Sequence, residues 1–173
     1  MKLSISEILD KTSKLNTQEE QVQFIRANDS VTLRQILEYA LSPAIKWLLP
    51  PGAPPFQYAN DIETHGMLYS QAKKLYLFIE GGHPNLNRFK RETLFVQLLE
   101  SIHPADADLI VAVKDKKIPY NISPSVFNEA FGFEFATNAP TSPGVEVKEV
   151  GPKETPKRGR GRPKKVNQEV NVD

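Results

Sequence analysis

Residues 17–41, TQEEQVQFIRANDSVTLRQILEYAL, contain two complete helix patterns with one short break between them. Thr17 and Glu20 have the spacing of a capping box, in which each side chain accepts a hydrogen bond from the other residue's backbone N–H. Apolar residues then recur at helical spacing, and the Asn-Asp-Ser sequence ending at Ser30 is a typical start for the second helix. Because the break is short, the two helices must be antiparallel or steeply crossed neighbours. This segment predicts an all-α domain.

Helical spacing continues on both sides of this segment. The sequence predicts further helices over about residues 3–15, 44–49, 66–80, 86–101, 103–113 and 123–131, with a stiff proline-rich loop at 50–61. The pattern places Tyr76 and Phe89 toward the core and Arg91 toward solvent. The run Leu109–Val113 also fits a buried strand, but no partner strand is visible, which favours helix. We expect a compact bundle of about six to seven short helices.

Charge divides the chain into an acidic body and a basic tail. Residues 1–139 hold 14 Lys+Arg and 16 Asp+Glu, whereas residues 140–173 hold 8 and 5. From about residue 137 the chain is rich in proline and charge and poor in apolar residues, so it cannot bury enough apolar surface to fold. We therefore predict a helical domain over residues 1–135 and a disordered tail over 136–173. The basic tail indicates an anionic partner.

The tail contains six cations within the nine residues 157–165, KRGRGRPKK. Arg160, Gly161, Arg162 and Pro163 form a core that resembles the AT-hook. The narrow minor groove of AT-rich DNA attracts arginine side chains, and a glycine without Cβ lets the backbone approach the groove floor. The cations expected to contact phosphates are Lys157, Arg158, Lys164 and Lys165. The alternative is a solvated basic tail, such as a nuclear-localisation-like string.

Scattered residues in the body resemble the N-terminal all-α DNA-binding domain of ATP-dependent DNA ligases, particularly those of large tailed phages. The likeness spans about residues 3–133 and is carried by the sequences at 5–9, 21–25, 28–29, 37–40, 45–47, 51–52, 77–80 and 126–132. The chain is also similar to a small type of protein from such phages. The resemblance implies contact with duplex DNA from the minor-groove side. By position, it implies a turn that presents cations and backbone N–H groups to a phosphate, formed by Lys114, Lys116, Lys117, Asn121 and Ser123.

The chain lacks the Lys-x-Asp-Gly nucleophile motif of ligases, so the sequence predicts no catalysis. It has no cysteine and only three histidines, and we expect no metal and no cofactor. The expected partner is double-stranded, AT-rich DNA. The alternative is an adaptor that docks a phage or host replication or transcription protein, with the tail as a tether. We expect no membrane contact and a cytoplasmic location, in the host cell if the protein is phage-encoded.

Other chemically interesting residues have structural interpretations. Asp106 and Asp108 fit charges at a helix N-terminus, and His103 before a proline fits a helix cap. Trp47, Phe56 and Tyr58 have two interpretations, a stacking surface for bases or anchors that hold the proline-rich loop on the core. We favour the anchors.

Overall fold

The computed structural model describes residues 2–135, without the side chains of residues 61 and 62. The chain divides into two units, residues 1–140 and 141–173, and the fold below is that of the first. Its helices are α1 (Ile5–Ser13), α2 (Gln18–Ala27), α3 (Val31–Leu41), α4 (Asp61–Thr64), α5 (Leu68–Gln71), the 3₁₀ helix η1 (Ala72–Phe78), α6 (Arg88–Leu99), α7 (Pro104–Lys114) and α8 (Pro124–Phe131). Residues 2–135 contain no strand beyond one isolated bridge, which confirms the all-α class.

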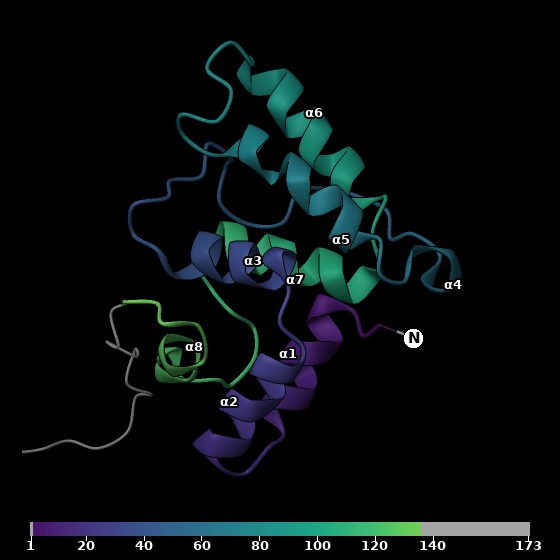
Figure 1. Ribbon diagram of the computed structural model, residues 1–173. Coiled ribbons are helices and arrows are strands. Elements are labelled where there is room, and N and C mark those ends of the chain that lie inside the picture. Colours follow the sequence, from purple (N-terminus) through teal and green to yellow (C-terminus); the bar gives the residue numbers. More distant parts are fainter. Residues whose placement is uncertain (1, 136–173) are drawn as a thin grey trace, which may run out of the picture. The chain divides into compact units, whose positions relative to one another are not determined.

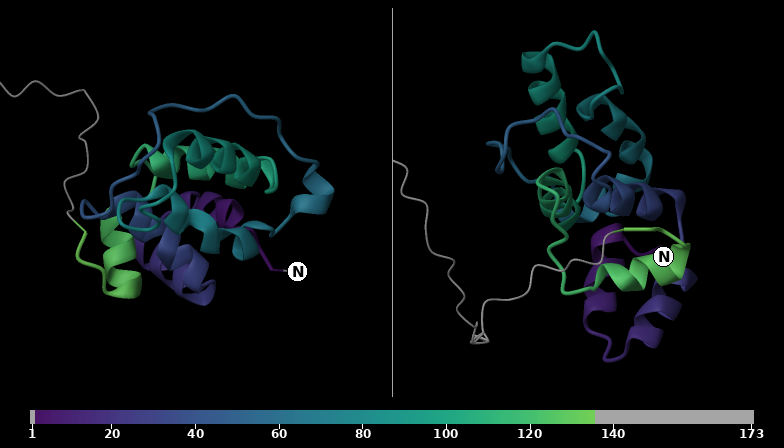
Figure 2. Two further views of the ribbon diagram at one scale, coloured as in Figure 1. Left: turned by 90° about the horizontal axis from the view of Figure 1, so that it is seen from above. Right: turned by 90° about the vertical axis from the view of Figure 1, so that its left-hand side faces the viewer.

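The helices form three tiers (Figure 1). Helices α1, α2 and α8 make the lower tier, α3 and α7 cross the middle, and η1 and α6 form the upper tier. Figure 2 shows the long connection after α3 passing along one side of α6 and α7 before the chain enters α4. The largest fully buried side chains come from all three tiers and include Ile8, Leu37, Phe95 and Phe127. No helix in this described part has the length and apolar content that crossing a bilayer would require.

The helix starts expected at Thr17, Ser30 and His103 are confirmed. Ser4 with Glu7 and Thr17 with Glu20 form complete capping boxes at α1 and α2. The predicted cap His103 accepts a hydrogen bond at Nδ1 from the Ala105 N–H, at 3.3 Å. The run Leu109–Val113 lies within α7, so its helical interpretation is correct.

The predicted helix over residues 44–49 is wrong. The backbone at Trp47 is extended and forms an antiparallel bridge to Ile79. The Leu48 N–H donates to the Phe78 carbonyl and the Glu80 N–H to the Lys46 carbonyl, each at 2.8 Å. The prolines that bracket this stretch leave too few residues for a stable helix, and the end of η1 offers partners from a distant part of the chain.

The predicted helix over residues 66–80 is only partly correct. One α-helical turn, α5, passes directly into the seven-residue 3₁₀ helix η1. The buried residues Ala72, Leu75 and Phe78 are spaced by three, which matches the three residues per turn of a 3₁₀ helix. Tyr76, expected in the core, is 44% exposed.

Helix α6 is rotated from the expected orientation. Phe89, predicted to face the core, is 81% exposed, and Arg91, predicted to face solvent, is 8% exposed. Arg91 donates from Nε to the Leu77 carbonyl at 3.1 Å and from Nη2 to the Leu86 carbonyl at 2.8 Å. Both hydrogen bonds are partly buried, and the arginine supplies the donors for these backbone carbonyls. Apolar periodicity alone carries no signal for this requirement.

The end of the described chain is held by one side chain. Asn128 in α8 donates from Nδ2 to the Phe135 carbonyl at 2.9 Å, and its Oδ1 accepts from the Phe135 N–H at 3.0 Å. Phe131, Phe133 and Phe135 pack their rings against one another and against the core. The chain therefore leaves α8 along a fixed path as far as Phe135.

Candidate nucleic-acid interface

The turn that ends α7 is a Schellman motif. The Lys116 N–H donates to the Val113 carbonyl at 3.0 Å, and the Lys117 N–H donates to the Ala112 carbonyl at 2.9 Å. Lys116 adopts a φ of 60°, and it is the only residue other than glycine with positive φ among those the structure describes. The N–H groups of Lys116 and Lys117 are therefore occupied and are not free to bind a phosphate. The turn is also a helix C-terminus, whose dipole disfavours an anion.

Two of the three lysines expected at a phosphate donate to the protein's own backbone. Lys114, nearly fully buried, donates from Nζ to the Pro50 carbonyl at 2.8 Å and pairs with Asp115. Lys116 donates from Nζ to the carbonyls of Tyr39 and Ser42, both at 2.9 Å. These carbonyls lie at the C-terminal end of α3, so Lys116 caps a second helix. Desolvation lowers the pKa of Lys116.

The other three residues of the predicted phosphate contact differ in whether their side chains are already hydrogen-bonded within the protein. The Lys117 side chain is exposed and makes no hydrogen bond or ion pair with another described residue. Asn121 is also exposed. Ser123 is the N-cap of α8, and its Oγ accepts a hydrogen bond from the Ser125 N–H at 3.4 Å. Of the five positions, Lys117 and Asn121 leave their side chains available to a partner.

A hollow of about 460 Å³ lies beside the turn, lined by Trp47, Leu49, Pro51 and residues 114–117. Trp47 donates from its indole N–H to the Tyr39 carbonyl at 3.3 Å and packs edge-on against the Tyr39 ring. The hollow thus combines an aromatic wall with one available cation, Lys117, next to Asp115 and to the lysines that already donate to backbone carbonyls.

The three aromatic residues considered for base stacking form two separate groups. Trp47 packs on Tyr39, whereas Phe56 and Tyr58 pair with each other at 4.9 Å between ring centroids. Trp47 and Phe56 are partly buried against the core, which supports the interpretation as anchors of the proline-rich loop.

Carboxylates in α7 and at the C-terminal ends of α6 and α7 accept hydrogen bonds from the long connection after α3. The Gly52 N–H donates to Asp115 at 3.1 Å, the Gln57 N–H to Glu100 at 3.2 Å, and the Tyr58 hydroxyl to Asp108 at 2.7 Å. Between this connection and α6 lies a groove of about 500 Å³, walled by Pro50–Pro55 and by Phe89, Phe95 and Val96. The sequence did not single out this groove, because the exposure of Phe89 depends on how α6 is rotated.

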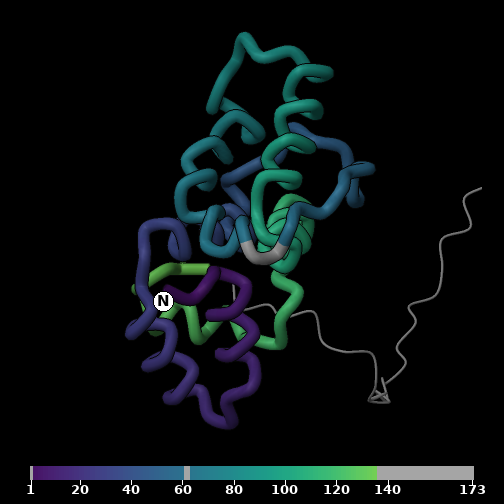
Figure 3. Tube along the Cα trace, turned by 90° about the vertical axis from the view of Figure 1, so that its right-hand side faces the viewer, coloured from purple at the N-terminus to yellow at the C-terminus, as the bar shows by residue number. Residues whose placement is uncertain are grey.

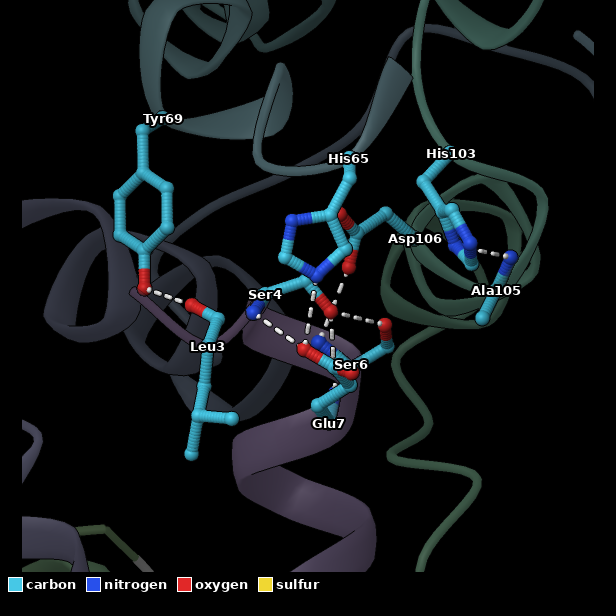
Figure 4. A network of polar contacts seen from close by, with 9 residues as sticks. All are labelled: Leu3, Ser4, Ser6, Glu7, His65, Tyr69, His103, Ala105 and Asp106. Carbon is cyan, nitrogen blue, oxygen red and sulfur yellow. Dashed lines mark hydrogen bonds and ion pairs between the residues drawn. The ribbon is translucent and has the colours of Figure 1, made fainter. Parts of the chain in front are cut away.

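The N-termini of α1 and α7 meet in a buried polar junction (Figure 4). The Ser6 N–H donates to Asp106 Oδ1 at 2.9 Å, and Asp106 Oδ2 is buried with no hydrogen-bond partner among the described residues. Burial raises the pKa of Asp106, although its bonds with Ser6 act in the opposite direction. The interpretation of Asp106 as a charge at a helix N-terminus is confirmed.

A second carboxylate, Glu7, lies at the edge of this junction. The hydrogen bond from the Ser4 N–H, at 2.8 Å, is the main cause that lowers the pKa of Glu7. Glu7 Oε2 also lies 3.0 Å from His65 Nε2, and the His65 ring packs edge-on against His103. No group of side chains in residues 2–135 has the arrangement of a metal site. These contacts join α1, α7 and the segment before α5.

The tail positions of the predicted interface lie outside the described residues. They are Lys157, Arg158, Arg160, Gly161, Arg162, Pro163, Lys164 and Lys165. The structure therefore describes the body half of the predicted DNA interface.

Comparison with protein families gives a match over most of the helical domain. A family model described as "Family of unknown function (DUF6433)" matches residues 8–120, which is more than half of the chain and runs from α1 to the segment before α8. No curated protein and no solved structure matches. The chain therefore belongs to the DUF6433 family, whose function is unknown.

Proposed function

We propose that this protein is a non-catalytic, duplex-DNA-binding accessory protein whose tail binds AT-rich minor groove. The observation that carries the proposal is the sequence Arg160-Gly161-Arg162-Pro163 within a run of six cations in nine residues. Arginines separated by a glycine suit a narrow, electronegative groove, and the flanking cations add a salt-dependent attraction to phosphates. The helical body adds a second, weaker contact with the DNA backbone.

The charge distribution of the body supports a leading role for the tail. Arg26 donates to the carbonyls of Glu129 and Ala130 at the C-terminal end of α8. Arg91, Lys114 and Lys116 likewise donate to backbone carbonyls. The body, with 14 cations and 16 anions, thus uses several of its cations internally. Non-specific affinity depends on cations that are available to phosphates.

The tail is tested by the double substitution Arg160→Ala/Arg162→Ala in the full chain. Lys148→Ala/Lys153→Ala is the matched control, because it removes the same charge from the tail outside the motif. Fluorescence anisotropy with AT-rich and GC-rich duplexes measures both affinities. The arginine variant should lose its preference for AT-rich duplex and bind it roughly tenfold more weakly, whereas the control keeps the preference. Equal losses in the two variants would reduce the motif to ordinary positive charge.

The contact of the body is tested by Lys117→Ala. If Lys117 contacts a phosphate, its loss lowers the slope of log affinity against log salt concentration by about one. Lys11→Ala is the control, because Lys11 is an exposed lysine on α1, in a different tier of the fold. An unchanged slope for Lys117→Ala would remove the hollow beside α7 from the interface.

The groove beside α6 favours a second candidate function, a protein adaptor that the tail tethers to DNA. Phe89 at this groove is 81% exposed, and large exposed apolar side chains beside a preformed groove are typical of interaction sites. Phe89→Ser should abolish co-purification of a replication or transcription protein from infected cells. Val31→Ser is the matched control, because Val31 is 84% exposed and lies outside the groove. Identical co-purification by both variants would count against the adaptor.

A further inference from the structure

Helices η1 and α6 lie side by side in the upper tier (Figure 3). A small cleft lies between them. Its volume is about 250 Å³. It is lined by Gln71, Lys74, Leu77, Phe78, Leu94, Gln97, Leu98 and Ser101. This volume is roughly eight times the ~30 Å³ that one water molecule occupies in the liquid, so the cleft admits a single ring system.

The 3₁₀ geometry of η1 creates one wall of the cleft. In a 3₁₀ helix, residues three apart lie directly above one another. Gln71, Lys74 and Leu77 therefore follow one edge, next to the buried edge formed by Ala72, Leu75 and Phe78. The wall from α6 has the spacing of one α-helical face, since its residues are 94, 97, 98 and 101.

The chemistry of the two walls is selective. Leucines and Phe78 supply apolar surface, Gln71 and Gln97 supply carboxamides, and Lys74 supplies a cation at an exposed position. The Lys74 ammonium makes no hydrogen bond or ion pair with another described residue. The hydroxyl of Ser101 donates to the Leu98 carbonyl, which leaves its oxygen as an acceptor.

Gln71 carries an unmet hydrogen-bond acceptor. Its Oε1 is buried and accepts no hydrogen bond from the described residues. An unpaired buried acceptor is unfavourable, so a ligand gains an interaction if its donor meets the carboxamide oxygen once that oxygen turns toward the cleft. The terminal torsion of glutamine is soft, and rotating it turns the carboxamide toward a ligand at little cost.

We propose that this cleft binds one adenine nucleotide. The ring lies between the apolar side chains, the exocyclic amine donates to Gln71 Oε1, and the phosphate pairs with Lys74. A glutamine carboxamide matches adenine because it accepts from N6 while it donates to N7. The nucleotide is either free or an adenosine exposed in single-stranded DNA. The site is separate from the duplex interface and does not depend on the tail.

The test is a titration of the full chain with dAMP. The backbone-amide and side-chain NMR chemical shifts of η1 and α6 are monitored during the titration. Binding should shift residues 71–78 and 94–101. Lys74→Ala and Gln71→Leu should each weaken binding roughly tenfold, the scale of one lost charge-assisted or bidentate contact. Lys73→Ala is the matched control, because Lys73 is the adjacent exposed lysine and does not line the cleft. Thermal unfolding of each variant shows whether the fold is retained.

Further titrations distinguish a free nucleotide from single-stranded DNA and test whether the base must be adenine. Single-stranded oligo-dA that shifts the cleft residues when dAMP does not would assign the nucleotide to nucleic acid, and binding of dAMP alone would assign it to the free pool. Equal binding of dTMP and dAMP would overturn the assignment of adenine. No shifts with either dAMP or oligo-dA would overturn the site, as would equal losses in Lys73→Ala and Lys74→Ala. Loss of duplex binding in Arg160→Ala/Arg162→Ala tests the tail and not the cleft. Failure of the proposed duplex binding can therefore be distinguished from failure of the proposed nucleotide site.

Discussion

The two ends of α7 bury opposite charges. At its N-terminal end, Asp106 accepts a hydrogen bond from an amide of α1, and at its C-terminal end Lys114 and Lys116 donate to carbonyls of other segments. Each sign matches the helix dipole, which is positive at the N-terminus and negative at the C-terminus. The comparison teaches that lysines at a helix C-terminus can serve mainly as hydrogen-bond donors to backbone carbonyls that lack a partner. Such a sequence is a weak indicator of a DNA site.

The anionic end should be the more sensitive to substitution, because Asp106 is fully buried. Asp106→Ala leaves the Ser6 N–H without its acceptor and is expected to lower the free energy of unfolding by about 2–3 kcal/mol. Asp108→Asn is the matched control on the same helix, because the side chain is exposed and its amide oxygen still accepts from the Tyr58 hydroxyl, so the expected change is within about 0.5 kcal/mol. Urea unfolding measures both. Similar decreases in the free energy of unfolding for the two variants would show that the buried junction contributes no more to stability than an exposed residue of α7.

The same end should show a distinctive dependence on pH. Because burial raises the folded-state pKa of Asp106 above its unfolded value, the stabilisation linked to its proton is present at low pH. It is lost as pH rises through the folded pKa. Asp106→Asn cannot titrate, so its stability relative to the natural chain should increase as pH rises from the unfolded pKa through the raised folded pKa of Asp106, by about 1.4 kcal/mol for each unit of the pKa shift.

Glu7 contributes with the opposite sign, because its folded-state pKa is lowered. Its stabilisation is present above the unfolded pKa and is lost as pH falls. For this reason the measured quantity is the difference between Asp106→Asn and the natural chain, in which the contribution of Glu7 largely cancels. A difference that stays constant with pH would show that Asp106 has an ordinary pKa.

Substitutions at the cationic end should change the free energy of unfolding least. At Lys116, the contribution of the side-chain hydrogen bonds can be separated from that of the backbone at positive φ. Lys116→Ala removes the cap on the α3 carbonyls and keeps a side chain at positive φ. Lys116→Gly removes the same cap and relieves the backbone, so it should be more stable than Lys116→Ala by about 1 kcal/mol. Thermal or urea unfolding of the two variants gives this difference. Equal stability would mean that the left-handed turn carries no strain.

Local sequence signals predicted much of the fold. The capping box at Thr17, the start at Ser30 and the cap at His103 depend on residues within one turn, and all are present. The errors fall where distant segments decide the outcome. The stretch at Trp47 pairs with the end of η1, and the rotation of α6 follows the carbonyls that Arg91 satisfies.

The candidate site was less predictable for the same reason. A sequence shows that residues 114–117 are basic, but the carbonyls that Lys114 and Lys116 satisfy belong to residues 39, 42 and 50. The cleft beside η1 depends on a 3₁₀ geometry that the spacing of Ala72, Leu75 and Phe78 signals only weakly, since an α-helix tolerates the same residues.

The clamp between Asn128 and Phe135 has a consequence for the range over which the protein could act on DNA. The clamp fixes the point from which the basic run must be reached, and residues 136–156 span at most about 75 Å when fully extended. At about 3.4 Å for each base pair, this length corresponds to roughly twenty base pairs. In the proposed function, anything held by the helical body is therefore confined to within about two turns of the duplex from the AT-rich step that the arginines occupy.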